Sequence, residues 1–340
     1  MRPQLLKDTI KDLFLAPDSN PNLRHPRTMC IEGPPGGGKT TIVHEAGEDL
    51  GVPVIEQHLP TMLVEDFGIP DIMSSDDKQK FCYRMPHWFP IKGKAPERGI
   101  LLFDDRNQGG NDLQKVLANI QQARTLHGVP MPDRWMVIST GNRQVDRAGA
   151  NRVLGHLRNR ESVYELETQL DDSTQWMIAH NVRAEVISFL RFRPNLLHDY
   201  DPQRDSNPTP RSWVEGISDV LGTVRPEAEY ESFKGAVGEG AAAEFVGFMR
   251  IYRKLPNPDN IMLNPDKAEV PTDPATLYAL SGALANRCTE ANFSRAVTYF
   301  ERMPPEFSVL GVSYACRRDP DLSNTQAFVR WSIKHQNVLF

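Results

Sequence analysis

The sequence predicts an α/β fold for roughly its first half and an all-helical arrangement for the remainder. Two observations predict it. Short apolar runs alternate with helical patterns up to about residue 168, and several of these runs are apolar almost throughout, as in parallel strands buried on both faces. Beyond residue 168 the strand patterns fade and amphipathic helical patterns take over.

The predicted strands and helices follow in order along the chain. Five runs are predicted as strands, at Arg27–Glu32, Pro53–Leu59, Gly99–Asp105, Arg134–Thr140 and Ser162–Glu167. Helices are predicted at Thr40–Leu50, Asp112–Ala123, Ser173–Arg191 and Ala241–Lys254, from Arg211 onward, and again over 275–340. The five prolines within Leu255–Pro274 predict a linker or extended segment. We therefore expect a core over 1–168, a helical lid over 169–255 and a linker with a helical extension over 256–340.

Composition restricts the classes of protein and of site. The net charge of −5 and the pI of about 6.0 exclude an overall basic footprint for nucleic acid. The cysteines lie far apart without paired spacing, which argues against a metal site or a disulfide framework. The N-terminus lacks the apolar run of a signal peptide, and no apolar stretch is long enough for a membrane span. We expect a cytoplasmic protein without membrane contact.

The strongest chemical motif is the segment GPPGGGKT at residues 33–40. It follows a predicted strand and opens a predicted helix, the context of the phosphate-binding loop of P-loop NTPases. Glycines let backbone N–H groups surround phosphates, and the positive end of the following helix points at the same place. The expected ligand is ATP with Mg²⁺. The residues expected to bind the nucleotide are Gly33, Pro34, Pro35, Gly36, Gly37, Gly38, Lys39, Thr40 and Thr41.

Gly99–Asp105 provides the acidic partner of this loop. An apolar strand that ends in carboxylates places them at the edge of the sheet where ligands bind. We expect Lys39 to contact the β- and γ-phosphates, and Thr40 and Asp104 to hold Mg²⁺. Asp105 would orient or deprotonate the attacking water. An acidic turn without chemistry is the plain alternative for these two aspartates.

Four further segments carry a resemblance to one family. Ser139–Asn142 (STGN) and Leu154–Arg160 (LGHLRNR) resemble the sensor-1 position and the arginine-finger segment of AAA+ ATPases. Pro208–Trp213 (PTPRSW) resembles the sensor-2 segment of the MoxR-type AAA+ ATPases, and Gly128–Trp135 resembles that group's hairpin insertion before sensor 1. The resemblance covers roughly residues 25–220. It implies a homo-oligomeric ring, usually a hexamer, with ATP bound between subunits, and often a von Willebrand A-domain protein as partner.

The resemblance also implies roles for individual residues. Asn142 would position water near the γ-phosphate, Arg158 or Arg160 would reach the neighbouring subunit's site, and Arg211 would contact phosphate from the lid. Each has a plain alternative: a turn cap for Asn142 and solvated surface charges for the arginines. One departure matters, because AAA+ proteins carry Asp-Glu where this chain has Asp104-Asp105. The shorter carboxylate implies either a compensating backbone or slow hydrolysis.

Two segments are candidates for contact with a partner. In Glu56–Gly68 the residues Met62, Leu63 and Phe67 could engage a partner, and His87-Trp88-Phe89 could stack on a base or peptide. We favour packing within the parent domain for both segments.

Three classes of function remain open. The first is a protein-remodelling, chaperone-like ATPase. The second is a nucleic-acid motor or restriction-type translocase, for which the acidic net charge is unfavourable and a local cluster favourable. That cluster comprises Arg183, Arg191 and Arg193 with Phe189 and Phe192. The third is a nucleotide switch that does not hydrolyse ATP.

Overall fold

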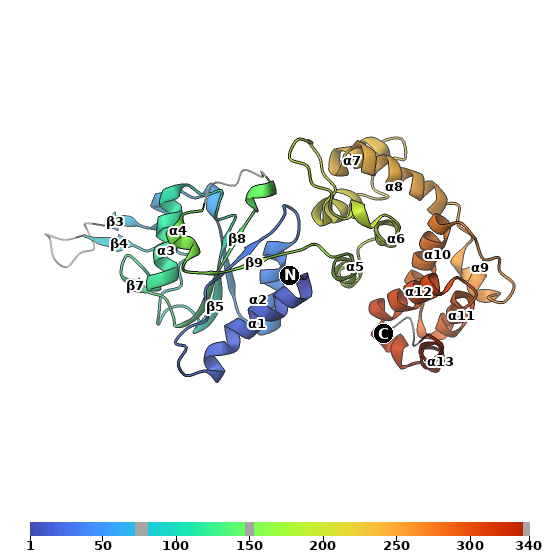
Figure 1. The fold of residues 1–340 in the computed structure, drawn as a ribbon, viewed down its shortest axis with the longest axis horizontal. Coiled ribbons are helices and arrows are strands. Elements are labelled where there is room, and N and C mark those ends of the chain that lie inside the picture. The colour runs from blue at the N-terminus through green and yellow to red at the C-terminus, as the bar shows by residue number, and fades with distance from the viewer. Residues whose placement is uncertain (72–80, 147–152, 336–340) are drawn as a thin grey trace. The chain divides into compact units, whose positions relative to one another are not determined.

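The computed structural model describes residues 1–71, 81–146 and 153–335 of the chain (Figure 1). The chain divides into two compact units, Met1–Thr168 and Gln169–Phe340, each with its own hydrophobic core. Among the described residues, no helix is both long and apolar enough to cross a membrane.

A five-stranded sheet with all its pairings parallel forms the centre of the first unit. The strand order is β2-β5-β8-β1-β9. The strands are β1 (Met29–Glu32), β2 (Val54–His58), β5 (Arg98–Asp104), β8 (Arg134–Gly141) and β9 (Ser162–Glu165). The five predicted strands are confirmed, with no end shifted by more than two residues. Because all strands run in the same direction, their carboxyl ends meet at one edge.

Helices cover both faces of this sheet (Figure 1). Side chains alternate along each strand. Ile100, Leu102, Met136 and Ile138 face α1 (Pro3–Ser19) and α2 (Lys39–Leu50) in one apolar cluster. Leu101, Phe103 and Val137 point the other way and pack with α3 (Asn111–Ala123) and α4 (Gly155–Arg158). The near-continuous apolar character of β5 and β8 is thus explained by burial on both sides.

Two small hairpins extend from the first unit. One pairs β3 (Ile69–Asp71) with β4 (Cys82–Arg84). The other pairs β6 (Thr125–Leu126) with β7 (Val129–Pro130) directly before β8. The predicted insertion Gly128–Trp135 therefore contains only the second arm of this hairpin. Its turn is made by His127 and Gly128, both in the left-handed region with φ of 49° and 80°.

The second unit is helical, and one core joins helices from both predicted segments, 169–255 and 256–340. Its helices are α5 (Leu170–Ala179), α6 (Ala184–Phe192), α7 (Glu229–Val237), α8 (Glu239–Tyr252), α9 (Pro258–Leu263), α10 (Pro274–Arg287), α11 (Glu290–Phe300), α12 (Pro305–Arg318) and α13 (Gln326–Lys334). A π-helical segment, Ser212–Ser218, begins where a helix was expected from Arg211. Residues 336–340 of the predicted extension lie outside the described residues.

Two sequence predictions in this unit were wrong. The helix predicted over Ser173–Arg191 is two helices, because the chain turns at Asn181 with φ of 56° and Val182 N–H bonds to the Met177 carbonyl. Asparagine adopts this left-handed conformation more readily than most residues. The predicted linker Leu255–Pro274 contains α9, where the Asn257 side chain accepts a hydrogen bond from the Asp259 N–H and Pro258 occupies the first turn.

Candidate functional site

The glycine-rich loop of residues 33–40, predicted to bind phosphate, connects β1 to α2 at the carboxyl edge of the sheet. Gly36 and Gly38 have φ of 69° and 87°, a region that disfavours residues with a Cβ. The Gly37 N–H donates to the Pro34 carbonyl at 3.3 Å and tightens the turn. α2 begins at Lys39, so its unpaired N–H groups and partial positive charge are directed into the loop. This backbone is suited to surround an anion.

Lys39 lies inside this loop. Its Nζ donates to the carbonyls of Gly33 and Pro34, at 3.1 Å each, and to Asn142 Oδ1 at 2.9 Å. The side chain is buried, and all three acceptors belong to the loop or to the end of β8. These hydrogen bonds hold the ammonium at the centre of the loop, from which it can reach an anionic ligand. Of the other predicted loop contacts, Thr41 is exposed on α2.

Asp104 connects the loop to the end of β5. Thr40 Oγ1 donates to Asp104 Oδ1 at 2.7 Å, and Thr140 Oγ1 donates to the same oxygen. A hydroxyl and a carboxylate side by side are hard oxygen donors, the type that Mg²⁺ prefers. The donor set thus fits the predicted Mg²⁺ ligands Thr40 and Asp104.

His58 adds a nitrogen to the same edge. It pairs with Asp104 in the β2–β5 register, and its Nδ1 lies 3.6 Å from Asp104 Oδ2. Ligand atoms of His58, Asp104 and Asp105 all lie within 4.8 Å of one another. Because Mg²⁺ prefers oxygen ligands, the predicted Mg²⁺ site consists of Thr40 and Asp104 and does not include His58.

Asp105 occupies a backbone conformation unusual for a residue with a side chain, with φ of 51°. Its N–H donates to Thr140 Oγ1 at 3.0 Å, and Asn142 Nδ2 lies 3.5 Å from Asp105 Oδ1. Asn142 therefore lies between the Lys39 ammonium and the Asp105 carboxylate. The Asn107 side chain anchors the backbone of Asn142. Its Nδ2 donates to the Asn142 carbonyl at 2.6 Å, and its Oδ1 accepts from the Asn142 N–H at 3.2 Å.

The three predicted arginines occupy different places. Arg158 ends α4, is about half exposed, and its Nη2 lies 3.5 Å from Glu32 Oε1. Arg160 is half-buried in the segment between α4 and β9. Arg211 belongs to the second unit, where it is exposed and its Nε lies 3.9 Å from Glu215 Oε1. The structure thus brings Lys39, Thr40, Asp104, Asp105 and Asn142 together and holds Arg158 at the carboxylate that precedes the loop.

Four further polar residues of the site were not predicted: Glu32, Arg106, Asn107 and Glu161. Arg106 and Glu161 are charged yet their side chains are fully buried, which sequence reasoning does not anticipate because such residues are usually exposed. A signal was present: Arg106 and Asn107 directly follow Asp104-Asp105, and Glu32 directly precedes the loop. Arg106 pairs with Glu32 and Glu161, so this cluster carries one positive and two negative charges, and Arg158 supplies the balancing cation.

The candidate contact segments pack mostly against their own domain. Phe67 is buried with its ring centroid 5.3 Å from that of Trp88, and both rings contact Phe103. Met62 is half-buried against the same cluster. Leu63, by contrast, has 67% of its surface exposed. The packing interpretation is confirmed for Phe67 and Trp88, and Leu63 remains available to a partner.

Comparisons with known proteins give only distant similarity. No family model matches the chain, and no curated protein matches it. The chain is similar to solved structures of two mutant forms of RuvB from Thermotoga maritima. One is 14% identical, covers 83% of this chain and 81% of that chain, and has a TM-score of 0.41; the other is 13% identical, covers 98% and 88%, and has a TM-score of 0.36.

A third similar structure is NtrX from Brucella abortus in complex with ADP. It is 12% identical, covers 98% of this chain and 67% of that chain, and has a TM-score of 0.38. With identities of 12–14% and TM-scores under 0.5, these similarities support no conclusion about this chain. The parallel sheet, the glycine loop between β1 and α2 and the acidic end of β5 are features of the molecule itself. They give residues 1–168 the α/β fold of a P-loop NTPase, which is followed by a helical second unit.

Proposed function

We propose that this chain is an ATPase of the AAA+ class, of the MoxR type, which hydrolyses MgATP at subunit interfaces of a ring to remodel or activate a partner protein. One observation carries the proposal. Lys39, Asn142 and Asp105 come from three different elements and form a continuous hydrogen-bonded chain at the carboxyl edge of the sheet. This chain supplies a cation, a polar amide and a carboxylate at one place, the groups that phosphoryl transfer to water uses.

Each group then has a defined task. The loop N–H groups and the Lys39 ammonium stabilise the negative charge of the phosphates, which is the main resource for catalysis of phosphoryl transfer. Asp105 accepts a hydrogen bond from the attacking water and takes its proton, while the Asn142 amide orients that water. Thr40 and Asp104 would hold Mg²⁺, which when bound neutralises charge on the phosphate oxygens.

A ring supplies what a single subunit lacks in this proposal. Arg158 or Arg160 would reach the neighbouring subunit's nucleotide, where a guanidinium stabilises charge on the transferring phosphoryl group. The half-exposed position of Arg158 at the end of α4 supports this role. Residues 169–255 would act as the lid, with Arg211 as its phosphate contact. A hexamer and a von Willebrand A-domain partner are the assembly and partner we propose.

A nucleotide switch is the second candidate, and Asp105 is the observation that favours it. Its carboxylate is one methylene shorter than the glutamate of AAA+ proteins, and displacements on the order of an ångström reduce the rate strongly. In such a switch ATP would set ring assembly without turnover. A nucleic-acid motor is less favoured, because Arg191 and Arg193 of the basic cluster pair with Asp171 at 2.7 Å and Glu244 at 2.6 Å.

The test is steady-state hydrolysis of MgATP by the full chain and by Lys39→Ala. Lys115→Ala is the matched control, since Lys115 is an exposed lysine on α3 that pairs with Asp112. We expect turnover in the wild type and in the control and its loss in Lys39→Ala. Wild-type turnover no higher than that of Lys39→Ala contradicts the ATPase proposal. Equilibrium ATP binding then separates a switch, which binds ATP, from a chain without nucleotide chemistry.

A further inference from the structure

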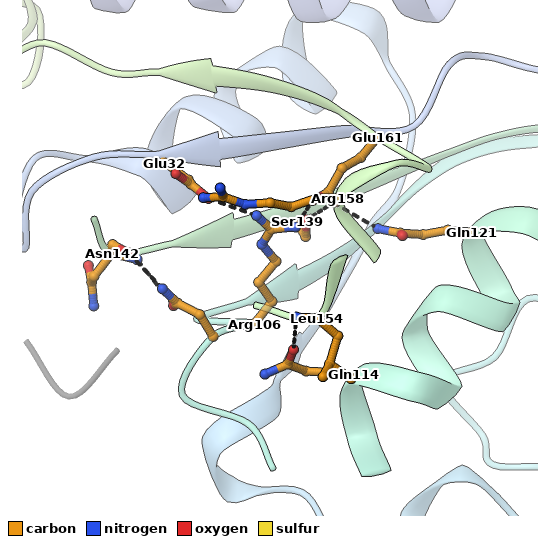
Figure 2. Close-up of polar contacts among 10 residues, drawn as sticks. Glu32, Arg106, Gln114, Gln121, Ser139, Asn142, Leu154, Arg158 and Glu161 are labelled. Carbon is orange, nitrogen blue, oxygen red and sulfur yellow. Dashed lines mark hydrogen bonds and ion pairs between the residues drawn. The ribbon is translucent and has the colours of Figure 1, made fainter. Parts of the chain in front are cut away.

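A charge cluster is buried between the sheet and the helices α3 and α4 (Figure 2). The Arg106 side chain has no exposed surface; its Nη2 donates to Glu32 Oε1 at 2.8 Å, and its Nη1 pairs with Glu161. Glu161 Oε2 also accepts hydrogen bonds from Gln121 Nε2 at 3.1 Å and Ser139 Oγ at 3.2 Å. Side chains from α3, β8 and the ends of β1, β5 and β9 thus meet around one guanidinium.

Stability alone does not account for this cluster. Taking charges out of water is costly, and well-packed apolar side chains often replace a buried ion pair without loss of stability. The opposite face of the same sheet is filled by apolar residues such as Ile31, Ile138 and Leu102. A buried charge cluster in a place where apolar side chains could pack therefore points to a positioning role.

The positions of the paired residues in the chain indicate what is positioned. Arg106 directly follows Asp105, and Glu32 directly precedes Gly33, the first residue of the loop. One 2.8 Å ion pair therefore ties the turn that carries the catalytic carboxylate to the loop that receives the phosphates. This connection is independent of the sheet, in which β8 separates β1 from β5.

The backbone of this turn requires such support. Asp105 is left-handed with φ of 51°, and a strained residue persists where its surroundings over-determine it. Its own N–H is held by Thr140 Oγ1, and the Arg106 N–H donates to the Thr140 carbonyl at 2.9 Å. Asn107, the next residue, bonds to the backbone of Asn142. The Arg106 side chain adds the attachment to β1 and to Glu161.

We propose that Arg106 is a positioning residue for the reaction: through Glu32 and Glu161 it fixes the Asp104–Asp105 turn at a set distance from the phosphate-binding loop. This inference rests on the proposed ATPase function. An attacking water must be held within about an ångström of its productive position, and a misplacement of that size costs about 10²-fold in rate.

The test separates positioning from folding by removing the charges together. Arg106→Met alone strands two buried carboxylates and is expected to destabilise the unit. The triple variant Arg106→Met/Glu32→Gln/Glu161→Gln removes all three buried charges of the cluster. Arg158, which loses Glu32 as its partner, is half exposed and stays solvated. Arg98→Met is the matched control, because Arg98 begins β5, the strand that leads to Arg106, and pairs with Asp18 at the surface. The full chain is assayed for kcat, KM for MgATP, melting temperature and amide hydrogen exchange.

For the triple variant we expect kcat to fall about 10²-fold with KM changed less than about threefold, and the Asp105 and Arg106 amides to exchange about tenfold faster. Wild-type kcat and wild-type exchange in a folded triple variant overturn the proposal. If the triple variant does not fold, Arg106→Lys decides: a lower kcat at an unchanged melting temperature supports positioning, and wild-type kcat overturns it. A wild type without turnover contradicts only the ATPase proposal, and the exchange rates then test positioning alone.

Discussion

The unusual conformation of Asp105 allows its charge and its backbone to be tested separately. Asp105→Asn keeps a side chain that tolerates the left-handed region and removes the negative charge. A general base contributes about 10²–10⁴-fold in rate, which corresponds to about 3–5 kcal/mol of transition-state stabilisation. We expect kcat to fall by this factor in Asp105→Asn, with ATP affinity and melting temperature close to those of the wild type.

Asp105→Ala and Asp105→Gly then test the backbone. The left-handed region costs a residue with a Cβ about 1–2 kcal/mol, and glycine does not incur this cost. For each kcal/mol of this difference in stability, the melting temperature of the Gly variant should lie about 2–4 °C above that of the Ala variant. Both variants should lose turnover as Asp105→Asn does. Turnover in Asp105→Asn equal to that of the wild type would refute the role of the carboxylate. Equal melting temperatures of the Ala and Gly variants would refute the left-handed backbone conformation of residue 105.

Three further predictions follow from the site. Thr40→Val removes the hydroxyl beside Asp104 and should raise the Mg²⁺ concentration needed for ATP binding about tenfold, while isothermal titration without Mg²⁺ shows little change. Arg158→Ala and Arg160→Ala should identify the trans arginine: the correct variant loses about 10³-fold in kcat, keeps ATP binding, and recovers turnover when mixed with a Lys39→Ala subunit. Burial raises the pKa of the Cys30 thiol and so lowers its thiolate fraction; peptide mapping after maleimide treatment at pH 8 should find exposed Cys82 labelled and Cys30 labelled only after unfolding.

Sequence reasoning succeeded where the determinants are local. The middle of β5, Ile100–Phe103, is apolar at every position, so its burial on both faces of the sheet follows from the residues themselves. The loop at Gly33–Thr40 depends on glycines that tolerate φ of 69° and 87°, and a continuous run of residues encodes it. The prediction of one long helix over Ser173–Arg191 was wrong, because the chain turns at Asn181. The two helices on either side of this turn, α5 and α6, pack into the same apolar core.

The candidate site divides in the same way. Lys39 and Thr40 were predicted from the loop motif, Asp104 from its place at the carboxyl end of an apolar strand, and Asn142 from a resemblance to the sensor-1 position. Arg106 and Glu161 were not, because they are 55 residues apart in the chain (161 − 106) and only the packing of α3 and α4 on the sheet buries them as a pair. A charged residue in a sequence is expected at the surface, and its partner cannot be read from spacing.

The sequence by itself determined the glycine-rich loop at residues 33–40, the acidic end of β5 and the alternation of strands and helices, because each depends on neighbouring residues and on a fixed period. The tertiary structure decided the order β2-β5-β8-β1-β9, the left-handed turn at Asp105 and the burial of Arg106 between two glutamates. These features depend on contacts between residues distant in the chain, whose free energy appears only when the sheet and its covering helices are packed together.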